Sequence, residues 1–184
     1  LYEYSFAYTG IKGEFTPPEN LDEIGAYAFR GTAITALTVS SANAENLIIG
    51  IGAWQDCSAL ESVDLPFAGA EYEGDYGWFA YIFGAGAPKA SGSYTPAGLR
   101  TVRVEHATEE ITWENLFADS LKASSQTLAE ITLPDGLANI GYEAFLCFEN
   151  LIAVDIPATA TTFDRYAFDG CIRLTSINLP EGLK

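Results

Sequence analysis

The sequence of 184 residues has no methionine, one histidine and three cysteines, and its 9 basic side chains are far outnumbered by 25 acidic ones. A catalytic Ser-His-Asp or Cys-His arrangement would have to use this one histidine. A zinc or iron site is not expected, because histidine is rare and the cysteines are few. The formal net charge of −16 repels phosphate backbones and anionic membranes, so we expect no nucleic-acid partner. No apolar run of about 18 residues occurs, so no membrane insertion is expected.

Apolar side chains nevertheless make up 48% of the chain, which is too many for a disordered acidic segment. The length suits one domain of ordinary size, and we expect a single domain over residues 1–184. The sequence starts and stops inside the repeat described next. We therefore expect a fragment, open at both ends, from which any signal peptide is missing.

A four-residue pattern, apolar-polar-apolar-Pro, marks the repeat. It occurs at residues 63–66, 131–134, 154–157 and 177–180. The last three prolines are spaced by 23 residues, and weaker copies of the apolar alternation occur at 37–39 and 102–104. A fixed period of this length is typical of a solenoid, in which each unit forms one coil of a stack.

A second pattern, Ile-Gly-x-x-Ala-Phe, follows the first at residues 24–29 and 140–145, with a variant at 163–168. Together they give the unit Leu-x-x-Ile-x-Leu-Pro-x-x-Leu-x-x-Ile-Gly-x-x-Ala-Phe-x-x-Cys/Thr. This unit resembles the BspA-type leucine-rich repeats of bacterial surface proteins, and the resemblance covers nearly the whole chain. As in that type, proline stands roughly where commoner leucine-rich repeats have asparagine.

The chemistry of one unit explains why such units stack. Ile131 and Leu133 alternate with polar residues, as in a strand with one buried face, and Pro134 ends that strand because it has no N–H. Gly141 permits a tight corner, and Phe145 can stack on the phenylalanine of the next coil. A single unit cannot bury its apolar face alone, so neighbouring units share one core.

With the resemblance, these features predict an α/β-type leucine-rich-repeat solenoid. We expect a right-handed coil of about six repeats of about 23 residues. The concave side should carry a parallel β-sheet, and the convex side should carry short strands, turns and single helical turns.

One segment, residues 68–95, interrupts the repeat with a glycine- and aromatic-rich insertion. It is either an aromatic contact patch or, as we favour, a segment whose Trp78, Phe79 and Phe83 fold back over the edge of a coil. Tyr72 and Tyr76 are flanked by acids and are expected to be exposed, which makes them candidate binding residues.

The three cysteines predict free thiols. Cys57 and Cys171 lie three residues after an aromatic residue, in a slot that holds Thr or Ser in other units, whereas Cys147 is one residue out of step, with Phe148 in the slot. A slot that accepts Cys, Thr or Ser is small and buried, and three cysteines from different coils cannot all pair. We therefore expect mostly buried, free thiols.

Motifs that carry catalysis or bind cofactors are missing. His106 follows a strand at a turn with no nucleophile motif nearby, and neither a G-x-S-x-G nor a phosphate-binding loop occurs. The alternating acids Glu71, Glu73 and Asp75 lack a calcium-loop pattern, which favours a solvated acidic strand over a cation site. We therefore expect no enzyme, no cofactor and no metal.

The outward face of the sheet is the remaining candidate surface, because residues that alternate with the buried ones point away from the core together. One row consists of Ala36, Ser62, Thr101, Glu130, Ala153 and Ser176. The candidate binding residues form the other row: Thr38, Asp64, Arg103, Thr132, Asp155 and Asn178. For any single residue, we favour the interpretation that it belongs to the solvent-facing side of a sheet. For the surface as a whole, we favour a concave docking surface of the kind that solenoids provide.

The resemblance implies a bacterial secreted or surface protein, extracellular or attached to the cell. We expect a monomeric, non-catalytic binding or adhesion module that recognises a host or extracellular-matrix protein or glycan through the concave face, the insertion or both. One alternative is a structural spacer that displays neighbouring domains. A less favoured alternative is an enzyme with an unrecognised carboxylate site, which requires two acids in one closed cleft.

Overall fold

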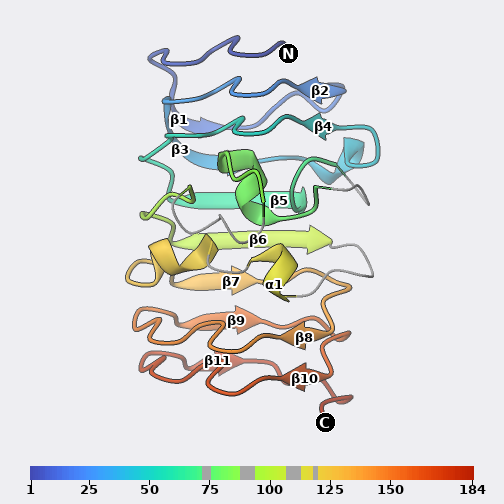
Figure 1. Ribbon diagram of the computed structural model, residues 1–184, viewed down its shortest axis with the longest axis vertical. Coiled ribbons are helices and arrows are strands. Elements are labelled where there is room, and N and C mark those ends of the chain that lie inside the picture. Colours follow the sequence, from blue (N-terminus) through green and yellow to red (C-terminus); the bar gives the residue numbers. More distant parts are fainter. Residues whose placement is uncertain (72–75, 88–93, 107–112, 118–119) are drawn as a thin grey trace.

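The computed structural model describes residues 1–71, 76–87, 94–106, 113–117 and 120–184. The chain winds into one stack of coils, with the N-terminus at one end of the long axis and the C-terminus at the other (Figure 1). Tyr72, Glu73 and Asp75 lie outside the described residues.

A parallel sheet forms one side of the stack, in the order β1-β3-β5-β6-β7-β9-β11. Its strands are β1 (Lys12–Phe15), β3 (Ala33–Thr38), β5 (Ser62–Phe67), β6 (Thr101–His106), β7 (Glu130–Thr132), β9 (Ala153–Asp155) and β11 (Ser176–Ile177). Each strand contributes one rung and pairs with the strand of the adjoining coil. The predicted solenoid of about six turns with a parallel sheet is therefore confirmed.

The convex side consists of short elements, as predicted. Two parallel pairs lie here, β2 (Glu23–Ile24) with β4 (Ile48–Ile49) and β8 (Asn139–Ile140) with β10 (Thr162–Phe163). The helical turns are η1 (Ser41–Asn43), η2 (Phe79–Phe83), α1 (Trp113–Leu116) and η4 (Ser120–Ser124). In Figure 1 these elements face away from the long sheet strands.

A second hydrogen-bond ladder joins the turns of the convex side along the stack. N–H groups of alternate residues donate to carbonyls of the next coil: Tyr27 to Ile51 (3.1 Å), Phe29 to Ala53 (2.8 Å) and Gly31 to Gln55 (2.8 Å). Two residues per coil, four apart, adopt left-handed backbone angles to make this turn, for example Tyr27 (φ 56°) and Gly31 (φ 69°). Outside the coils of η2 and α1, the convex side is thus as regular as the sheet.

The core between the two sides contains the predicted ring stack. Phe145 is fully buried and stacks on Phe168 at 5.2 Å between ring centroids, with 12° between the ring planes. At the other end of the molecule, Phe29 stacks on Phe6 (5.4 Å) and on Trp54 (5.9 Å). The Ala-Phe position therefore builds an aromatic column in both outer parts of the solenoid.

The glycine of the Ile-Gly pattern has a different role from the one we predicted. Gly25 and Gly50 occupy this position, and neither has a positive φ, so neither supplies a special corner. A Cβ on Gly25 would lie 2.6 Å from the backbone nitrogen of Glu3, and one on Gly50 would clash with the backbone nitrogen of Ala26. At Gly25 and Gly50, glycine is needed because the backbones of adjacent coils touch there.

The insertion builds a coil from a different sequence. Phe79 and Phe83 of η2 are fully buried, and Trp78 is half-buried with its indole N–H donating to the Ala85 carbonyl (2.9 Å). The N–H of Trp54 donates to the carbonyl of Ile82 (2.9 Å), so η2 takes the place of a convex turn in the stack. The predicted folding back is confirmed, although the rings fill the core rather than cover an edge.

All three cysteines are free thiols, as predicted, and they differ in burial. Cys57 is buried and its thiol donates to the Phe29 carbonyl (3.2 Å), which shows that the slot also satisfies a backbone acceptor. Thr32 makes the same bond within its own coil (2.9 Å). Cys171 is half-buried, but Cys147 is exposed, because Phe148 fills the core position beside it.

One strand was missed by the sequence patterns. In β1, Phe15 pairs with Leu37 of β3. It therefore occupies the place of the first apolar residue of the four-residue pattern. Pro17 follows where other units have a second aliphatic residue, and it is buried. The sequence Phe15-Thr16-Pro17-Pro18 is thus a divergent copy of the four-residue pattern, and a search that allowed proline at the third place would have found it.

Candidate functional site

The two predicted rows on the sheet are in register. Along the first row, Ser62 pairs with Thr101, which pairs with Glu130, and the series runs from Ala36 to Ser176. In the second row, the paired residues are Thr38, Asp64, Arg103, Thr132 and Asp155. Five of the six candidate residues of this face therefore lie side by side, one on each of β3, β5, β6, β7 and β9.

The sixth, Asn178, follows β11 and has a structural role. Its side-chain amide donates to the Ile156 carbonyl (2.8 Å), and its side-chain oxygen accepts from the Ile156 N–H (2.8 Å). The carboxamide thereby extends the strand ladder by one rung beyond Ile177. Asn178 remains exposed but has both ends of its polar group occupied.

Arg103 lies at the centre of the second row and is held by two acids. Its Nη1 atom is 3.0 Å from Asp64 Oδ1 and 2.6 Å from Glu105 Oε1. Hydrogen bonds to Asp64 and then to Glu105 raise the pKa of the Arg103 guanidinium, so it stays charged. The pairing fixes the orientation of the one basic side chain in this row.

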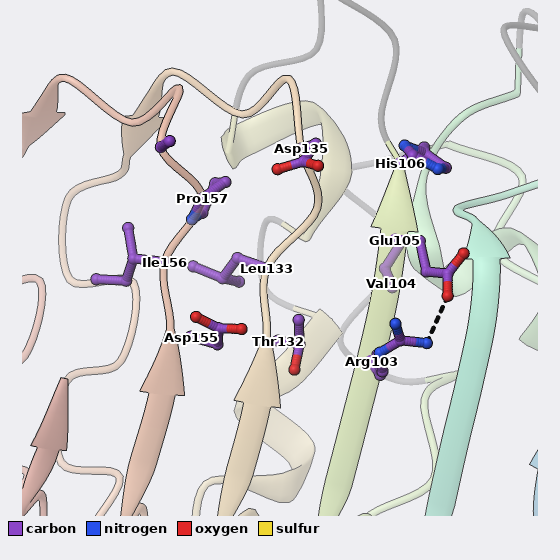
Figure 2. A pocket seen from close by; sticks show the side chains of 11 residues that line it. Arg103, Val104, Glu105, His106, Thr132, Leu133, Asp135, Asp155, Ile156 and Pro157 are labelled. Atoms are coloured by element: carbon purple, nitrogen blue, oxygen red, sulfur yellow. Dashed lines mark hydrogen bonds and ion pairs between the residues drawn. The ribbon is translucent and has the colours of Figure 1, made fainter. Parts of the chain in front are cut away.

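Two adjoining hollows open on this face. One has a volume of about 430 Å³ and runs from Arg103 past Asp155 to Pro157; the other, of about 390 Å³, runs from Asp64 past Arg103 to Asp155. In Figure 2, Thr132 and Asp155 lie on neighbouring strands opposite Arg103, and Asp135 lies near the end of β6. The predicted residues Asp64, Arg103, Thr132 and Asp155 all line one or both hollows.

Two acidic residues of this lining, Glu105 and Asp135, were not among the predicted residues. Glu105 continues the outward alternation of Thr101 and Arg103, so the same rule would have identified it. Asp135 lies beyond the end of its strand and is brought beside β6 by an isolated parallel bridge to His106. No strand pattern marks that position, and only the fold reveals it.

His106 closes one end of the larger hollow. His106 is exposed. It is the last residue of β6, whereas the sequence pattern had predicted that it lies in the turn after the strand. The carboxylates of Asp135 and Asp155, which line the same hollow, are also exposed. Such a surface differs from the closed cleft that a carboxylate-based enzyme needs.

The tyrosine candidates lie elsewhere. Tyr76, which is 50% exposed, stacks on Tyr81 (5.3 Å) and contacts Trp78 edge to face (5.5 Å). Its carbonyl accepts from the N–H of Ala70, whose own carbonyl accepts from Ile49 of the convex strand β4. The fold therefore separates Tyr76 from the sheet rows, and the candidates form two surfaces.

The described part of the chain contains no helix that is long and apolar enough to cross a membrane. Within the same residues, no group of three or more His, Cys, Asp and Glu side chains is arranged to hold a metal ion.

Comparison with known proteins relates the chain to one repeat family. The pattern described as the BspA type leucine rich repeat region matches in six copies over residues 1–76 and 106–184. No curated protein matches the chain.

Solved structures that match the chain include three bacterial leucine-rich repeat proteins. A leucine-rich repeat protein from Bacteroides ovatus is 21% identical, with 99% of this chain and 41% of that protein covered and a TM-score of 0.52. A leucine rich cell surface protein from Faecalibacterium prausnitzii is 17% identical, with 91% of this chain and 32% of that protein covered and a TM-score of 0.36. A leucine-rich repeat protein of T. pallidum is 21% identical, with 93% of this chain and 59% of that protein covered and a TM-score of 0.35. The chain thus spans less than two thirds of each of these proteins, and the first shares its fold.

Proposed function

The chain belongs to the BspA-type leucine-rich repeat family, and on that premise we propose that it is a non-catalytic binding module of a bacterial surface or secreted protein. The concave sheet face is the surface through which it binds a protein or glycan. One observation carries this proposal: two hollows adjoin over in-register side chains, and both are lined by Arg103 and Asp155. A sheet face that only contacted solvent would not require a continuous recess.

The charges of this face restrict the partner. Arg103 is neutralised by Asp64 and Glu105, whereas Glu130, Asp135 and Asp155 add further negative charge around the hollows. Like charges across an interface oppose association. We therefore propose a partner surface that is neutral or basic, such as a protein with exposed Lys or Arg or an uncharged glycan, and not a sulfated one.

A triple charge reversal tests this assignment. Asp64→Lys, Arg103→Glu and Asp155→Lys together make the face less negative, reverse the ion pair between positions 64 and 103, and place like charges at positions 103 and 105. Binding would be measured on a panel of soluble extracellular-matrix proteins and on a glycan array. For a partner that binds the wild-type chain, we expect the triple variant to lose about tenfold or more in affinity.

A matched control changes the net charge equally outside the sheet. Glu45, Glu149 and Arg173 are exposed, and the variant Glu45→Lys, Glu149→Lys, Arg173→Glu has the same net charge as the first. We expect it to bind within about twofold of wild type, because distant surface charges contribute little. Equal affinity of the wild-type chain and the sheet-face variant would show that the concave face is not the binding surface.

A structural spacer remains the second candidate function. One apolar core runs the length of the stack, from Ile24 to Ala167, which gives a stiff rod suited to holding other domains apart. Under this alternative, the wild-type chain binds nothing on either panel.

A further inference from the structure

A third hollow lies at the edge of the sheet where β5 and β6 begin. It has a volume of about 340 Å³ and is lined by residues from two turns, 55–58 before β5 and 94–98 before β6. It shares no lining residue with either hollow of the concave face. It is therefore a separate site, and it lies within the stack of coils.

This hollow lies where the ladder of the convex side loses a rung. In a regular coil, three alternate N–H groups donate to the next coil, and the third of these bonds runs from Gly31 to Gln55. In the coil of Gln55, the first two such groups donate to carbonyls of η2, but no described residue accepts from the third, the N–H of Asp56. Because η2 ends at Phe83, a recess remains where a regular coil would continue the ladder.

One wall of the recess is fixed by hydrogen bonds from the neighbouring coil. The buried hydroxyl of Ser124 donates to the Pro96 carbonyl (2.8 Å), and the hydroxyl of Thr127 donates to the carbonyls of Ala97 and Leu99 (2.8 Å each). These bonds hold residues 96–98 in place without a ligand. A preformed recess lowers the cost of ordering the protein when a ligand binds.

The opposite wall carries polar groups that the fold does not use. The carboxamide of Gln55 and the hydroxyl of Ser58 make no hydrogen bond with the described residues. Arg30 Nε donates to Asp56 Oδ2 (2.8 Å), which leaves the other carboxylate oxygen of Asp56 to a ligand. Together with the Asp56 N–H, this wall offers both donors and acceptors.

An aromatic ring lies beside these polar groups. Tyr94 lines the hollow and is 39% exposed. A Cβ built on Gly84 would lie 3.0 Å from the carboxamide carbon of Gln55 and 3.3 Å from Cδ1 of Tyr94. The carboxamide and the ring therefore lie close together over Gly84, which gives the hollow one apolar face next to its polar wall.

The charges around the hollow favour an uncharged ligand. Asp56 is the one charged residue of the lining, and Arg30 pairs with it at 2.8 Å. The hydrogen bond to Asp56 raises the pKa of the Arg30 guanidinium, so the pair persists over the whole physiological range. The chain as a whole, at −16, repels anions.

We propose that this hollow binds one neutral sugar residue, with the sugar hydroxyls bonded to Gln55, Asp56 and Ser58 and one face of the sugar ring packed on Tyr94. Hydroxyl groups both donate and accept, which suits the mixed polar wall, and the C–H face of a pyranose is flat and apolar. The volume is near the lower end of the range for ligand pockets, which fits a single sugar ring. The assignment is independent of what the concave face binds.

Titration of small glycosides into the isotope-labelled chain tests the assignment directly. The probes are the methyl glycosides of glucose, galactose, mannose and N-acetylglucosamine, followed by the amide signals in two-dimensional NMR. We expect at least one probe to bind with a dissociation constant of about 1 mM, as for other ligands of this size. The amide signal of Asp56 should shift, together with those of residues 55–58 and 94–98.

The variants separate the ring from the polar wall. Tyr94→Ala should weaken binding about fivefold or more, because the sugar loses its aromatic partner, whereas Tyr94→Phe keeps the ring and should bind within about twofold of wild type. Gln55→Leu preserves the size of the side chain and should cost about three- to tenfold. Tyr142→Ala removes an exposed tyrosine elsewhere and should leave binding unchanged. Circular dichroism of each variant shows whether the fold is intact.

Salt distinguishes a sugar from a basic side chain of a protein partner. Affinity for a neutral glycoside should change by less than about twofold when sodium chloride is raised to about 0.5 M, because no net charge is neutralised. Acetyl-arginine amide serves as the basic probe. If it binds the hollow more tightly than every glycoside and loses affinity with salt, the sugar assignment is wrong.

Three further results would overturn the proposal. The first is that no glycoside of the panel shifts the Asp56 amide at concentrations far above 1 mM. The second is that Tyr94→Ala, correctly folded, binds as well as wild type. The third is that the triple variant at positions 64, 103 and 155 loses glycoside binding, which would assign the sugar to the concave face. Retained binding by that triple variant supports the separate site.

Discussion

The outer coils of the solenoid and its two middle coils, which contain η2 and α1, share one sheet but are filled by different sequences. On either side, the Ile-Gly-x-x-Ala-Phe pattern sets a ring that stacks almost parallel to its neighbour, as Phe145 and Phe168 do at 12°. In the middle, Phe79 and Phe117 meet at 54° and Trp113 meets Phe145 at 63°. The family pattern is interrupted between residues 76 and 106, which include Phe79, whereas Trp113 and Phe117 lie within the second matched stretch.

This difference separates two requirements of the fold. The strands need only an alternation of buried and exposed residues, and Val63, Val102 and Ile131 supply it on both sides of the irregular segment. The convex half must fill a fixed volume, and it does so either with a repeated turn or with short helices such as η2 and α1. A solenoid can therefore change its convex half without losing register in the sheet.

The largest expected effect compares one core ring from each region. Phe145→Ala in a regular coil and Phe83→Ala in a middle coil both remove a fully buried ring. We expect each to lower the free energy of unfolding by about 3–5 kcal/mol in a urea titration, because both leave a cavity in one continuous core. Tyr142→Ala, at a ring that is 54% exposed, is the control and should cost less than about 0.5 kcal/mol.

A loss below about 1 kcal/mol for Phe83→Ala, with the full loss for Phe145→Ala, would break the comparison. It would mean that the middle segment lies outside the cooperative core and only covers it.

The next effect tests the close contact of backbones in the regular coils. Gly50→Ala places a methyl group against the backbone of Ala26, whereas Gly86→Ala, in the insertion, meets nothing within 4 Å. We expect Gly50→Ala to cost about 1–3 kcal/mol, since two coils must move apart, and Gly86→Ala to change stability by less than about 0.5 kcal/mol. Thermal unfolding of both variants measures the contrast, and equal losses would refute the close-contact explanation for this glycine.

These contrasts show which features the sequence could predict. The rows from Ser62 to Ser176 and from Asp64 to Asp155 followed from strand alternation, because side-chain direction has a period of two. The strand β1 was missed because Pro17 replaces its second aliphatic residue. Residues 68–95 were treated as an insertion because the short helix η2 does not carry the turn pattern, although its rings fill the same core.

The candidate site was predictable in part for similar physical reasons. A row of outward residues is a local property of each strand, so Arg103 and Asp155 were found. The depth of the hollows and the approach of Asp135 to β6 depend on the path of the chain after each strand ends. No periodic pattern in the sequence encodes that path.

A smaller effect concerns the thiols in and beside the slot. A water-soluble disulfide reagent should modify exposed Cys147 in the folded protein and reach buried Cys57 only on unfolding, with half-buried Cys171 between them. Mass spectrometry of the labelled peptides gives the order. Labelling of Cys57 as fast as Cys147 would show that the coil around Trp54 opens readily.

The smallest effect is the dependence of stability on pH through Cys57. Burial raises the pKa of this thiol, because the thiolate loses its water, so the folded state holds the proton more tightly than the unfolded state. The contribution of the Cys57 thiol to the free energy of unfolding is constant below the ordinary thiol pKa of about 8.5. It declines as the pH rises above that value, because the unfolded chain loses the proton first. Cys57→Ala lacks this group, so comparing the two proteins isolates its contribution. The difference in unfolding free energy between wild type and Cys57→Ala should therefore shrink between neutral pH and about pH 10. A difference that stays constant over that range would mean that the thiolate is as well solvated in the folded protein as in the unfolded chain, contrary to the burial of the slot.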